Sequence, residues 1–195
     1  MAQPTFSKKT IVATSKFLSL ILRHQPETIG VTLDPEGWLD IDTLIRQANK
    51  HGRELSKELI QVVVAENDKQ RFALSSDGLR LRANQGHSIR SIDLDLQAVA
   101  PPEILFHGTI EKFLTSIRSR GLLKQNRNHV HLSADRDTAI KVGSRRGKPV
   151  ILEVRATEMH RDGHDFYRSE NGVWLTDHVP PSYLAEVESP HRLST

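Results

Sequence analysis

The chain has 195 residues, of which 37% are hydrophobic and 26% are charged, with a formal net charge of +3. This composition is typical of a globular chain with its own core, and the absence of cysteine excludes a disulfide framework, a thiol nucleophile and a cysteine-built zinc site. No apolar run reaches the roughly 18–20 residues that cross a membrane, and no apolar signal core is present, so we expect a cytoplasmic protein.

The first half of the chain predicts three helices. Apolar residues recur at helical spacing over residues 8–24, where the helix ends in the pair "RH", Arg23 and His24, just before a proline. Cations are favourable in a last helical turn, so this pair has a simple capping interpretation. Two further helices are expected at 39–50 and 56–67.

Local signals mark the starts of the second and third helices and a hairpin after them. Asp42 is the expected N-cap of the second helix and Ser56 that of the third. Residues 71–83 alternate around an Asp-Gly pair, which is a strong signal for a β-hairpin. Helices followed by a two-stranded wing are typical of a winged-helix domain, a common nucleic-acid-binding architecture, and we expect this domain to span residues 1–90.

The character of the chain changes over residues 91–102. This segment has no basic side chain and ends in Pro-Pro, which is typical of a linker. Short strands and few helices are expected over residues 103–195, which predicts a second, α+β domain. Its expected strands lie in "EILFHGT", "HVHLS", "PVILEVRA", "GVWLT" and "YLAEVE", and its expected helices lie around 111–120 and 135–142.

Basic residues cluster in two segments. Residues 112–148 hold ten Lys and Arg against two Asp, and residues 69–90 hold five against one. Either cluster alone is also compatible with a solvated basic face. Together they favour a polyanionic partner, either nucleic acid or nucleotide phosphates.

Three histidines of the second half raise two chemical possibilities. His129 and His131 point to the same face of an expected strand, and His107 ends another strand beside a glycine that lets a ligand approach the backbone. Such a set could bind zinc, but no carboxylate follows at helical spacing and the arginine-rich surroundings disfavour a dication. The donors of "RNHVHLS" and "GSRRGK", Arg145 among them, suit nucleotide phosphates and ribose hydroxyls better.

Five long motifs follow one another along the chain. They are "FLSLILRHQPETIGVTLDPEGWLDIDTLI", "KQRFALSSDGLRLRANQGHS", "LFHGT", "RNHVHLSADRDTA" continued by "VGSRRGKPVILEV", and "FYRSENGVWLTDHVPPSYL". In this order they resemble the RNA 2′-phosphotransferase family, whose NAD-dependent enzymes remove an internal 2′-phosphate from RNA and are best known on spliced tRNA. The resemblance covers about residues 7–187, and a chance match to five motifs in sequence is improbable.

The resemblance implies a fold and a reaction. The fold would be an N-terminal winged-helix-like RNA lobe followed by a lobe of the ADP-ribosyltransferase fold. In the reaction, the RNA 2′-phosphate would attack the ribose carbon of NAD⁺ that bears nicotinamide, and nicotinamide would leave. The neighbouring ribose 2″-hydroxyl would then attack phosphorus, giving 2′-hydroxyl RNA and ADP-ribose 1″,2″-cyclic phosphate. NAD would be consumed as a co-substrate, and no metal would be needed.

The resemblance also implies which residues act on the phosphate. The family's Arg-His-Arg-Arg set matches Arg23 and His24 in "LRHQP", Arg71 in "KQRF" and Arg127 in "RNHVHLS". Fixed guanidiniums and an imidazolium would offset the charge that gathers on the phosphoryl oxygens, so the "RH" pair would be more than a helix cap. Lys69 is a further candidate phosphate contact, with an ordinary solvated lysine as the alternative.

The family's NAD-binding "HGT" matches His107, Gly108 and Thr109. The resemblance places His107 on a ribose, the Gly108 backbone on the nicotinamide amide, and Ser133 near the nicotinamide ribose. The remaining candidates for this pocket are His131, Arg145 and His129, and for the two histidines a structural role is equally open.

Two other functions stay open. One is an ADP-ribosyltransferase that uses the same NAD site on a protein or a nucleic-acid end, and the other is a non-enzymatic winged-helix RNA-binding protein that senses NAD. Many protein-modifying relatives place a catalytic Glu late in the fold, and "NGVWLT" marks none there, which favours an acceptor that is already ionised. We expect a monomer whose partners are 2′-phosphorylated RNA and NAD, with no membrane partner.

Overall fold

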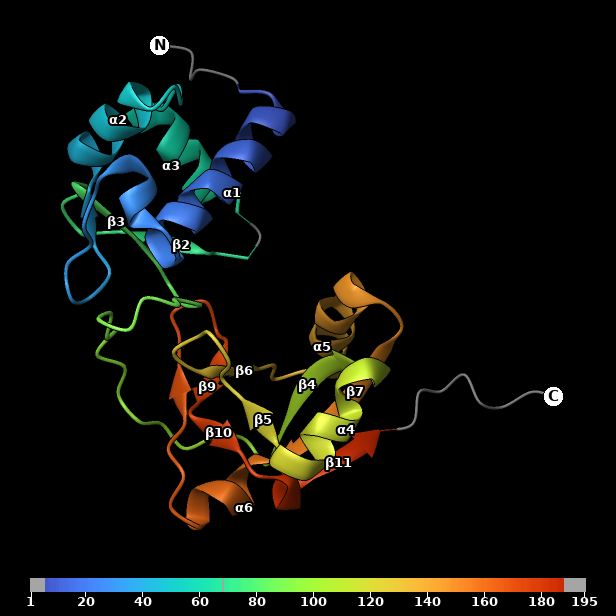
Figure 1. Cartoon of the computed structure of the whole chain (residues 1–195). Helices are drawn as coiled ribbons and strands as arrows, with labels where there is room; N and C mark the ends of the chain where they lie inside the picture. The colour runs from blue at the N-terminus through green and yellow to red at the C-terminus, as the bar shows by residue number, and fades with distance from the viewer. Residues whose placement is uncertain (1–5, 68, 188–195) are drawn as a thin grey trace. The chain divides into compact units, whose positions relative to one another are not determined.

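The chain folds into two units, each built around its own hydrophobic core (Figure 1). The computed structural model describes residues 6–67 and 69–187, and the units run from Met1 to Asp95 and from Leu96 to Thr195. The division falls within the segment 91–102 that the sequence marks as a linker. Both units combine helices with antiparallel strands, which confirms the predicted α+β class.

The described part of the first unit consists of three α-helices and one small sheet. The strands pair antiparallel in the order β1-β3-β2, and the turn between β2 and β3 is the predicted hairpin. The three predicted helices are confirmed. In chain order the elements are α1 (Lys8–Arg23), a 3₁₀ turn (Pro26–Ile29), β1 (Leu39–Asp40), α2 (Ile41–Lys50), α3 (Lys57–Ala65), β2 (Phe72–Leu74) and β3 (Arg80–Ala83).

Helix α1 carries the "RH" pair at its end. Its start is capped by Ser7, whose side chain accepts a hydrogen bond from a backbone N–H of the first turn. Its apolar stripe is fully buried at Leu18, Ile21 and Leu22 and packs the helix against α3. Because the helix ends at Arg23 directly after this stripe, the core contact fixes the position of the pair.

One cap prediction is wrong and one is confirmed. The N-cap of α2 is Asp40, whose Oδ1 accepts the Thr43 backbone N–H at 2.8 Å, whereas Asp42 lies inside the first helical turn. The cap lies earlier than predicted because strand β1 pairs with β3 and holds Asp40 in an extended conformation. Ser56 does cap α3, since its Oγ accepts the Leu59 backbone N–H at 3.2 Å.

The described part of the second unit has three small antiparallel sheets, β11-β7-β4, β6-β9-β8 and β10-β5. The five predicted strands and two predicted helices are confirmed, whereas β5, β8, β10 and α6 are not predicted. In chain order the elements are β4 (Ile104–Ile110), α4 (Glu111–Arg120), β5 (Leu122–Leu123), β6 (Val130–Leu132), α5 (Arg136–Gly143), β7 (Pro149–Arg155), α6 (Ala156–Arg161), β8 (Tyr167–Arg168), β9 (Trp174–Thr176), β10 (His178–Val179) and β11 (Leu184–Val187).

Strand β4 organises the second unit. It pairs along its whole length with β7, where His107 lies opposite Leu152. On its other edge, Phe106 and Ser133 exchange two backbone hydrogen bonds of 2.8 Å, which joins β4 to the end of β6. Helix α5 packs against β4 (Figure 1). The motifs "LFHGT" and "HVHLS" are therefore neighbours in space.

Among residues 6–67 and 69–187, no helix has both the length and the apolar character that spanning a bilayer requires.

Candidate functional site

The first unit brings Arg23 and Arg71 together. Arg23 closes α1, and its Nη2 donates a hydrogen bond to the backbone oxygen of Arg71 at 3.4 Å. The Arg23 guanidinium carbon lies 6.0 Å from the centre of the Phe72 ring. A Cβ added to Gly86, whose φ is +88°, would lie 3.6 Å from Arg23 Nη1, so the backbone of the "RANQGHS" motif runs along this guanidinium. Two arginines far apart in sequence are thus held in contact.

Asn84 and Asn67 fix the position of Arg71. The Asn84 backbone N–H donates to the Arg71 oxygen at 2.9 Å, and its Nδ2 donates to the Gln70 oxygen at 2.7 Å. The Arg71 side chain is held separately, because Nη1 donates to Asn67 Oδ1 at 3.1 Å. The same Asn67 oxygen accepts the Lys69 backbone N–H at 3.2 Å. The motif that contains Asn84 therefore has a positioning function within the first unit.

Ser88 connects the two members of the "RH" pair. Its backbone N–H donates to the Arg23 oxygen at 2.9 Å, and its Oγ lies 2.9 Å from His24 Nδ1 and 3.4 Å from that same Arg23 oxygen. Ser88 Oγ therefore joins the Arg23 carbonyl to the His24 ring, which orients the imidazole at the end of α1.

We expect Ser88→Ala to lower kcat/KM of the reaction about fivefold, because one hydrogen bond that orients His24 is worth about 1 kcal/mol. Ser88→Thr keeps the hydroxyl and should restore activity. In a His24→Ala background, Ser88→Ala should have no further effect, because its partner is gone. Steady-state kinetics of the four variants test this, and additive losses would show that Ser88 does not act through His24.

His87 is a buried imidazole behind the same pair. It is 2% exposed, and a Cβ on Gly37 would lie 3.2 Å from its Nε2. Burial first, and then the positive charges of Arg23, His24 and Arg82, lower the pKa of His87 to about 4. His87 is therefore neutral at pH 7 and adds no charge to the cations in front of it.

A histidine with a depressed pKa makes the fold sensitive to acid. Between about pH 6.5 and pH 4 the unfolded state binds the His87 proton and the folded state does not, so stability is lost as the pH falls through this range. The expected loss from this group is roughly 3 kcal/mol by pH 4. Measured by urea unfolding, the free energy of unfolding should differ less between pH 7 and pH 4 in His87→Asn than in the wild type. The same change at exposed His51 should leave this difference as it is in the wild type. An equal effect of the two variants would contradict the assignment.

In the second unit, His107 is held as a neutral acceptor. Its Nδ1 lies 3.1 Å from the backbone oxygen of His131, so Nδ1 carries the proton and donates. Burial lowers the pKa of His107, and the charges of Arg127 and Arg146 lower it as well, against the opposite effect of the His131 hydrogen bond. Nε2 of the neutral ring is then a hydrogen-bond acceptor, which suits a ribose hydroxyl.

Arg127 and Arg146 act on His107, and Arg145 lies near Arg127. The pKa of Arg127 is lowered, first by burial and then by the neighbouring charges of Arg146 and Arg145. Positive charge concentrated in this way is costly unless an anion offsets it. The set is therefore suited to the phosphates of a nucleotide. Arg146 was not among the predicted site residues, although it belongs to the "GSRRGK" motif that the sequence marks as suited to phosphates.

The structure gives Gly108 a role in packing. A Cβ at Gly108 would lie 1.9 Å from the backbone oxygen of Ala139 and 2.9 Å from the Gly143 nitrogen, so the glycine lets α5 approach β4. Thr109 follows in β4 and is 8% exposed. His129 packs against Tyr167, with the ring centres 5.6 Å apart. The contact of the Gly108 backbone with a ligand stays a prediction, and so does any direct ligand contact of Thr109, Ser133, Arg145 or His131.

The predicted site residues fall into two groups, one in each unit. The first unit holds Arg23, His24 and Arg71 together through Ser88 and the Arg71 backbone. The second unit holds the others together around β4, β6 and the "GSRRGK" turn. Among residues 6–67 and 69–187, no group of three or more His, Cys, Asp or Glu side chains is arranged to hold a metal ion.

Comparison with known proteins agrees with this arrangement of motifs. The model of the RNA 2′-phosphotransferase, Tpt1/KptA family matches residues 9–178. A probable RNA 2′-phosphotransferase of Rhodopirellula baltica is 62% identical over 176 residues, covering 90% of this chain and 96% of that protein. Probable RNA 2′-phosphotransferases of Acaryochloris marina (60% identical, covering 90% and 97%) and Pseudomonas fluorescens (56% identical, covering 91% and 98%) are also similar.

The family match spans both units and includes the residues that converge in each of them. The chain therefore belongs to the RNA 2′-phosphotransferase, Tpt1/KptA family.

Proposed function

We propose that this chain transfers an internal 2′-phosphate from RNA to NAD⁺ in two steps, through an RNA-2′-phospho-ADP-ribose intermediate. Membership of the RNA 2′-phosphotransferase family supports the RNA substrate. The observation that carries the rest is the contact between Arg23 and Arg71 beside His24. The Arg23 side chain is held on the Arg71 backbone, and the Arg71 guanidinium is held by Asn67. Guanidinium groups fixed in this way beside His24 would suit a phosphate dianion, which arginine binds through two parallel hydrogen bonds.

The second unit supplies groups that fit NAD as a substrate. The neutral His107 would accept a hydrogen bond from a ribose hydroxyl through Nε2, and Arg145 and Arg146 would offset the charge of the pyrophosphate. Arg127 is assigned to the transferred phosphate. The lowered pKa values of His107 and Arg127 support an anion here, because both arise partly from unbalanced positive charge.

The proposed steps balance without an external oxidant or a metal. In the first step, an oxygen of the 2′-phosphate forms a bond to the ribose C1″, and the bond from C1″ to nicotinamide breaks. In the second, the 2″-hydroxyl oxygen bonds to phosphorus, the bond from phosphorus to the RNA 2′-oxygen breaks, and the hydroxyl proton passes to that oxygen. The arginines stabilise the negative charge on the phosphoryl oxygens throughout.

We also infer the architecture of the two units. The order α1, β1, α2, α3, β2, β3 in the first unit supports a winged-helix fold. Antiparallel sheets joined through β4 and β6, with α5 packed on β4, support an ADP-ribosyltransferase-like fold for the second.

Release of nicotinamide tests the proposed function. The enzyme should release nicotinamide from NAD⁺ only when RNA with a 2′-phosphate is present, and this should persist after exhaustive chelation of metals. A protein-modifying ADP-ribosyltransferase would instead need a protein acceptor, and a binder that only senses NAD would release none. Release that requires a protein, or restoration only by an added divalent cation, would contradict the proposal.

A further inference from the structure

A groove runs along α1 and reaches the end of that helix, where His24 and Arg71 line it. It has a volume of about 660 Å³ and is bounded by α1, by the end of α3 and by the segment that leads into β2. All its lining residues belong to the first unit. Helix α1 has 16 residues and so is about 24 Å long, which gives the groove more room than one phosphate group requires.

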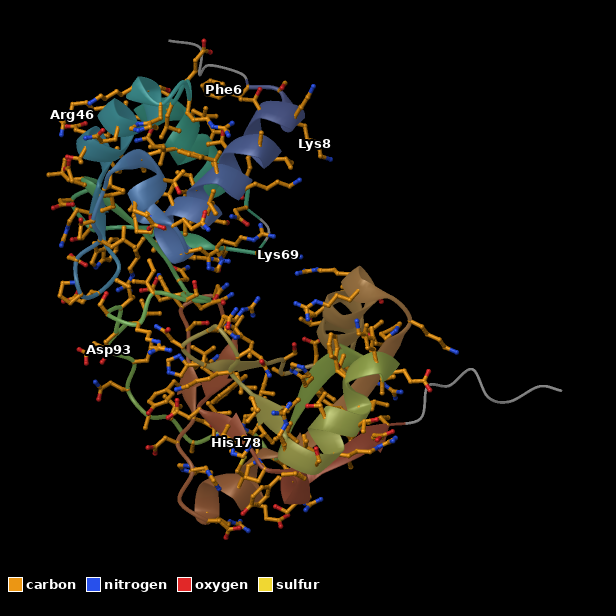
Figure 2. All side chains as sticks on the ribbon, in the orientation of Figure 1. Phe6, Lys8, Arg46, Lys69, Asp93 and His178 are labelled. Carbon is orange, nitrogen blue, oxygen red and sulfur yellow. The ribbon has the colours of Figure 1, made fainter. Side chains whose placement is uncertain are left out.

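Cations are distributed along the whole groove. Lys8 lines it at the first turn of α1, Lys16 lines its middle, and Lys69 lines its end beside Arg71. Figure 2 shows Lys8 at the start of α1 and Lys69 in the segment before β2. Lys8 and Lys16 are about 12 Å apart along the helix axis. Among the described lining residues, Glu66 is the one carboxylate. This distribution of charge fits an extended polyanion.

The floor between these cations is apolar. Val12 and Leu20 line the groove and are 46% and 37% exposed, so their apolar surface is open to a ligand. Ile11 and Val63 complete this surface. An unpaired base would bury apolar surface here while its phosphate meets a lysine. In a duplex the bases are already stacked and paired, so the groove favours a single strand.

We propose that this groove binds the single-stranded RNA that flanks the 2′-phosphorylated nucleotide. Flanking phosphates lie against Lys8 and Lys16, and flanking bases lie against Val12 and Leu20. The inference rests on the proposed function, because the 2′-phosphate assigned to His24 and Arg71 would sit at one end of the groove. The RNA chain that carries this phosphate then follows α1, and the first unit recognises several nucleotides.

Direct binding tests the groove independently of catalysis. The probe is a labelled single-stranded dodecamer RNA, and fluorescence anisotropy gives its affinity over a range of salt concentrations. Each single-strand phosphate contact contributes about 0.7 to the slope of log affinity against log salt, so the Lys8→Ala/Lys16→Ala double variant should lower this slope by about 1.4. Lys8 and Lys16 lie on the exposed face of α1, and alanine is a strong helix former, so the helix should stay folded.

The matched control is Lys9→Ala/Lys57→Ala. Both lysines are exposed, both lie in first helical turns of the same unit, and neither lines the groove. This variant has the same net charge as the groove variant and should keep the wild-type slope. An unchanged slope in the groove variant, or an equal decrease in both variants, would overturn the proposal.

Substrate length supplies the second readout. Wild type and the control should have a lower KM for a 2′-phosphorylated dodecamer than for a 2′-phosphorylated dinucleotide, and the groove variant should lose this preference. Equal KM values in the wild type would overturn the groove proposal and leave the proposed function intact. If the wild type released no nicotinamide with either RNA, the proposed function would fail, while the binding experiment would still decide whether the groove holds RNA.

Discussion

Arg71→Ala and Arg127→Ala should each accumulate RNA-2′-phospho-ADP-ribose, because these arginines support the second step of the proposed reaction more than the first. In the first step a charged phosphate attacks the ribose carbon, and its rate depends largely on positioning. In the second step the hydroxyl attacks phosphorus, and cations must neutralise the phosphoryl oxygens. Loss of one well-placed donor commonly costs about 100- to 1000-fold in rate.

Arg71→Ala should leave the backbone contacts around residue 71 intact. The contacts that hold Arg23 and Asn84 use the backbone oxygen of Arg71, which alanine retains. The substitution removes the guanidinium and its bond to Asn67. Arg127→Ala removes one of several neighbouring positive charges, so we expect no loss of folding stability from it. Slow turnover in either variant would then reflect a slower chemical step and not a loss of folded protein.

A gel time course with 2′-phosphorylated RNA and NAD⁺ checks this prediction. The control variants are Arg46→Ala in α2 and Arg161→Ala in α6, both exposed arginines outside the site, and they should behave as the wild type. Loss of activity with no intermediate at any time would place the arginines before the second step. Near-normal rates in both variants would show that the site has been misassigned.

The elements of this fold were predictable where one local signal dominates. Helix α1 is indicated by the apolar periodicity over 8–24, and the hairpin by its Asp-Gly turn. The start of α2 was misplaced because Asp40 and Asp42 are both plausible caps, and pairing of β1 with β3 decides between them. Strands of two residues, such as β5 and β10, are too short to show an alternation of apolar and polar residues, so they cannot be predicted from the sequence. They form because they pair with each other.

The site was predictable only in part for a similar reason. Resemblance to a family identified the residues that would touch ligands, but the residues that hold these in place depend on contacts between distant segments. Ser88 is 64 residues from His24 in sequence, and no local pattern marks their hydrogen bond. The groove along α1 was missed because Lys8 and Lys16 lie outside the two basic segments of the sequence.

Gly108→Ala should destabilise the second unit strongly. Its Cβ would lie 1.9 Å from the Ala139 backbone oxygen and 2.8 Å from the Ala139 carbonyl carbon, and backbone cannot move aside as a flexible side chain does. Helix α5 would have to shift away from β4. Overpacking costs about 1–3 kcal/mol, and a backbone clash belongs at the upper end of that range or above it. At about 3 kcal/mol, we expect a decrease in Tm of about 6–12 °C for a chain of this size.

Gly143→Ala provides the matched control, because Gly143 lies on the other side of the same contact between α5 and β4. A Cβ there would be 3.0 Å from Pro149 Cβ and 3.1 Å from the Thr109 oxygen, so its neighbours need to move by only a few tenths of an ångström. Thermal unfolding should give Gly108→Ala a Tm well below that of Gly143→Ala.

The ligand role implied by the family resemblance makes a different prediction. If Gly108 were needed only for contact with the nicotinamide amide, Gly108→Ala would lose activity while its Tm stayed unchanged. Loss of both stability and activity in Gly108→Ala would show that packing of α5 on β4 places His107 and Ser133, and an unchanged Tm would contradict the packing role.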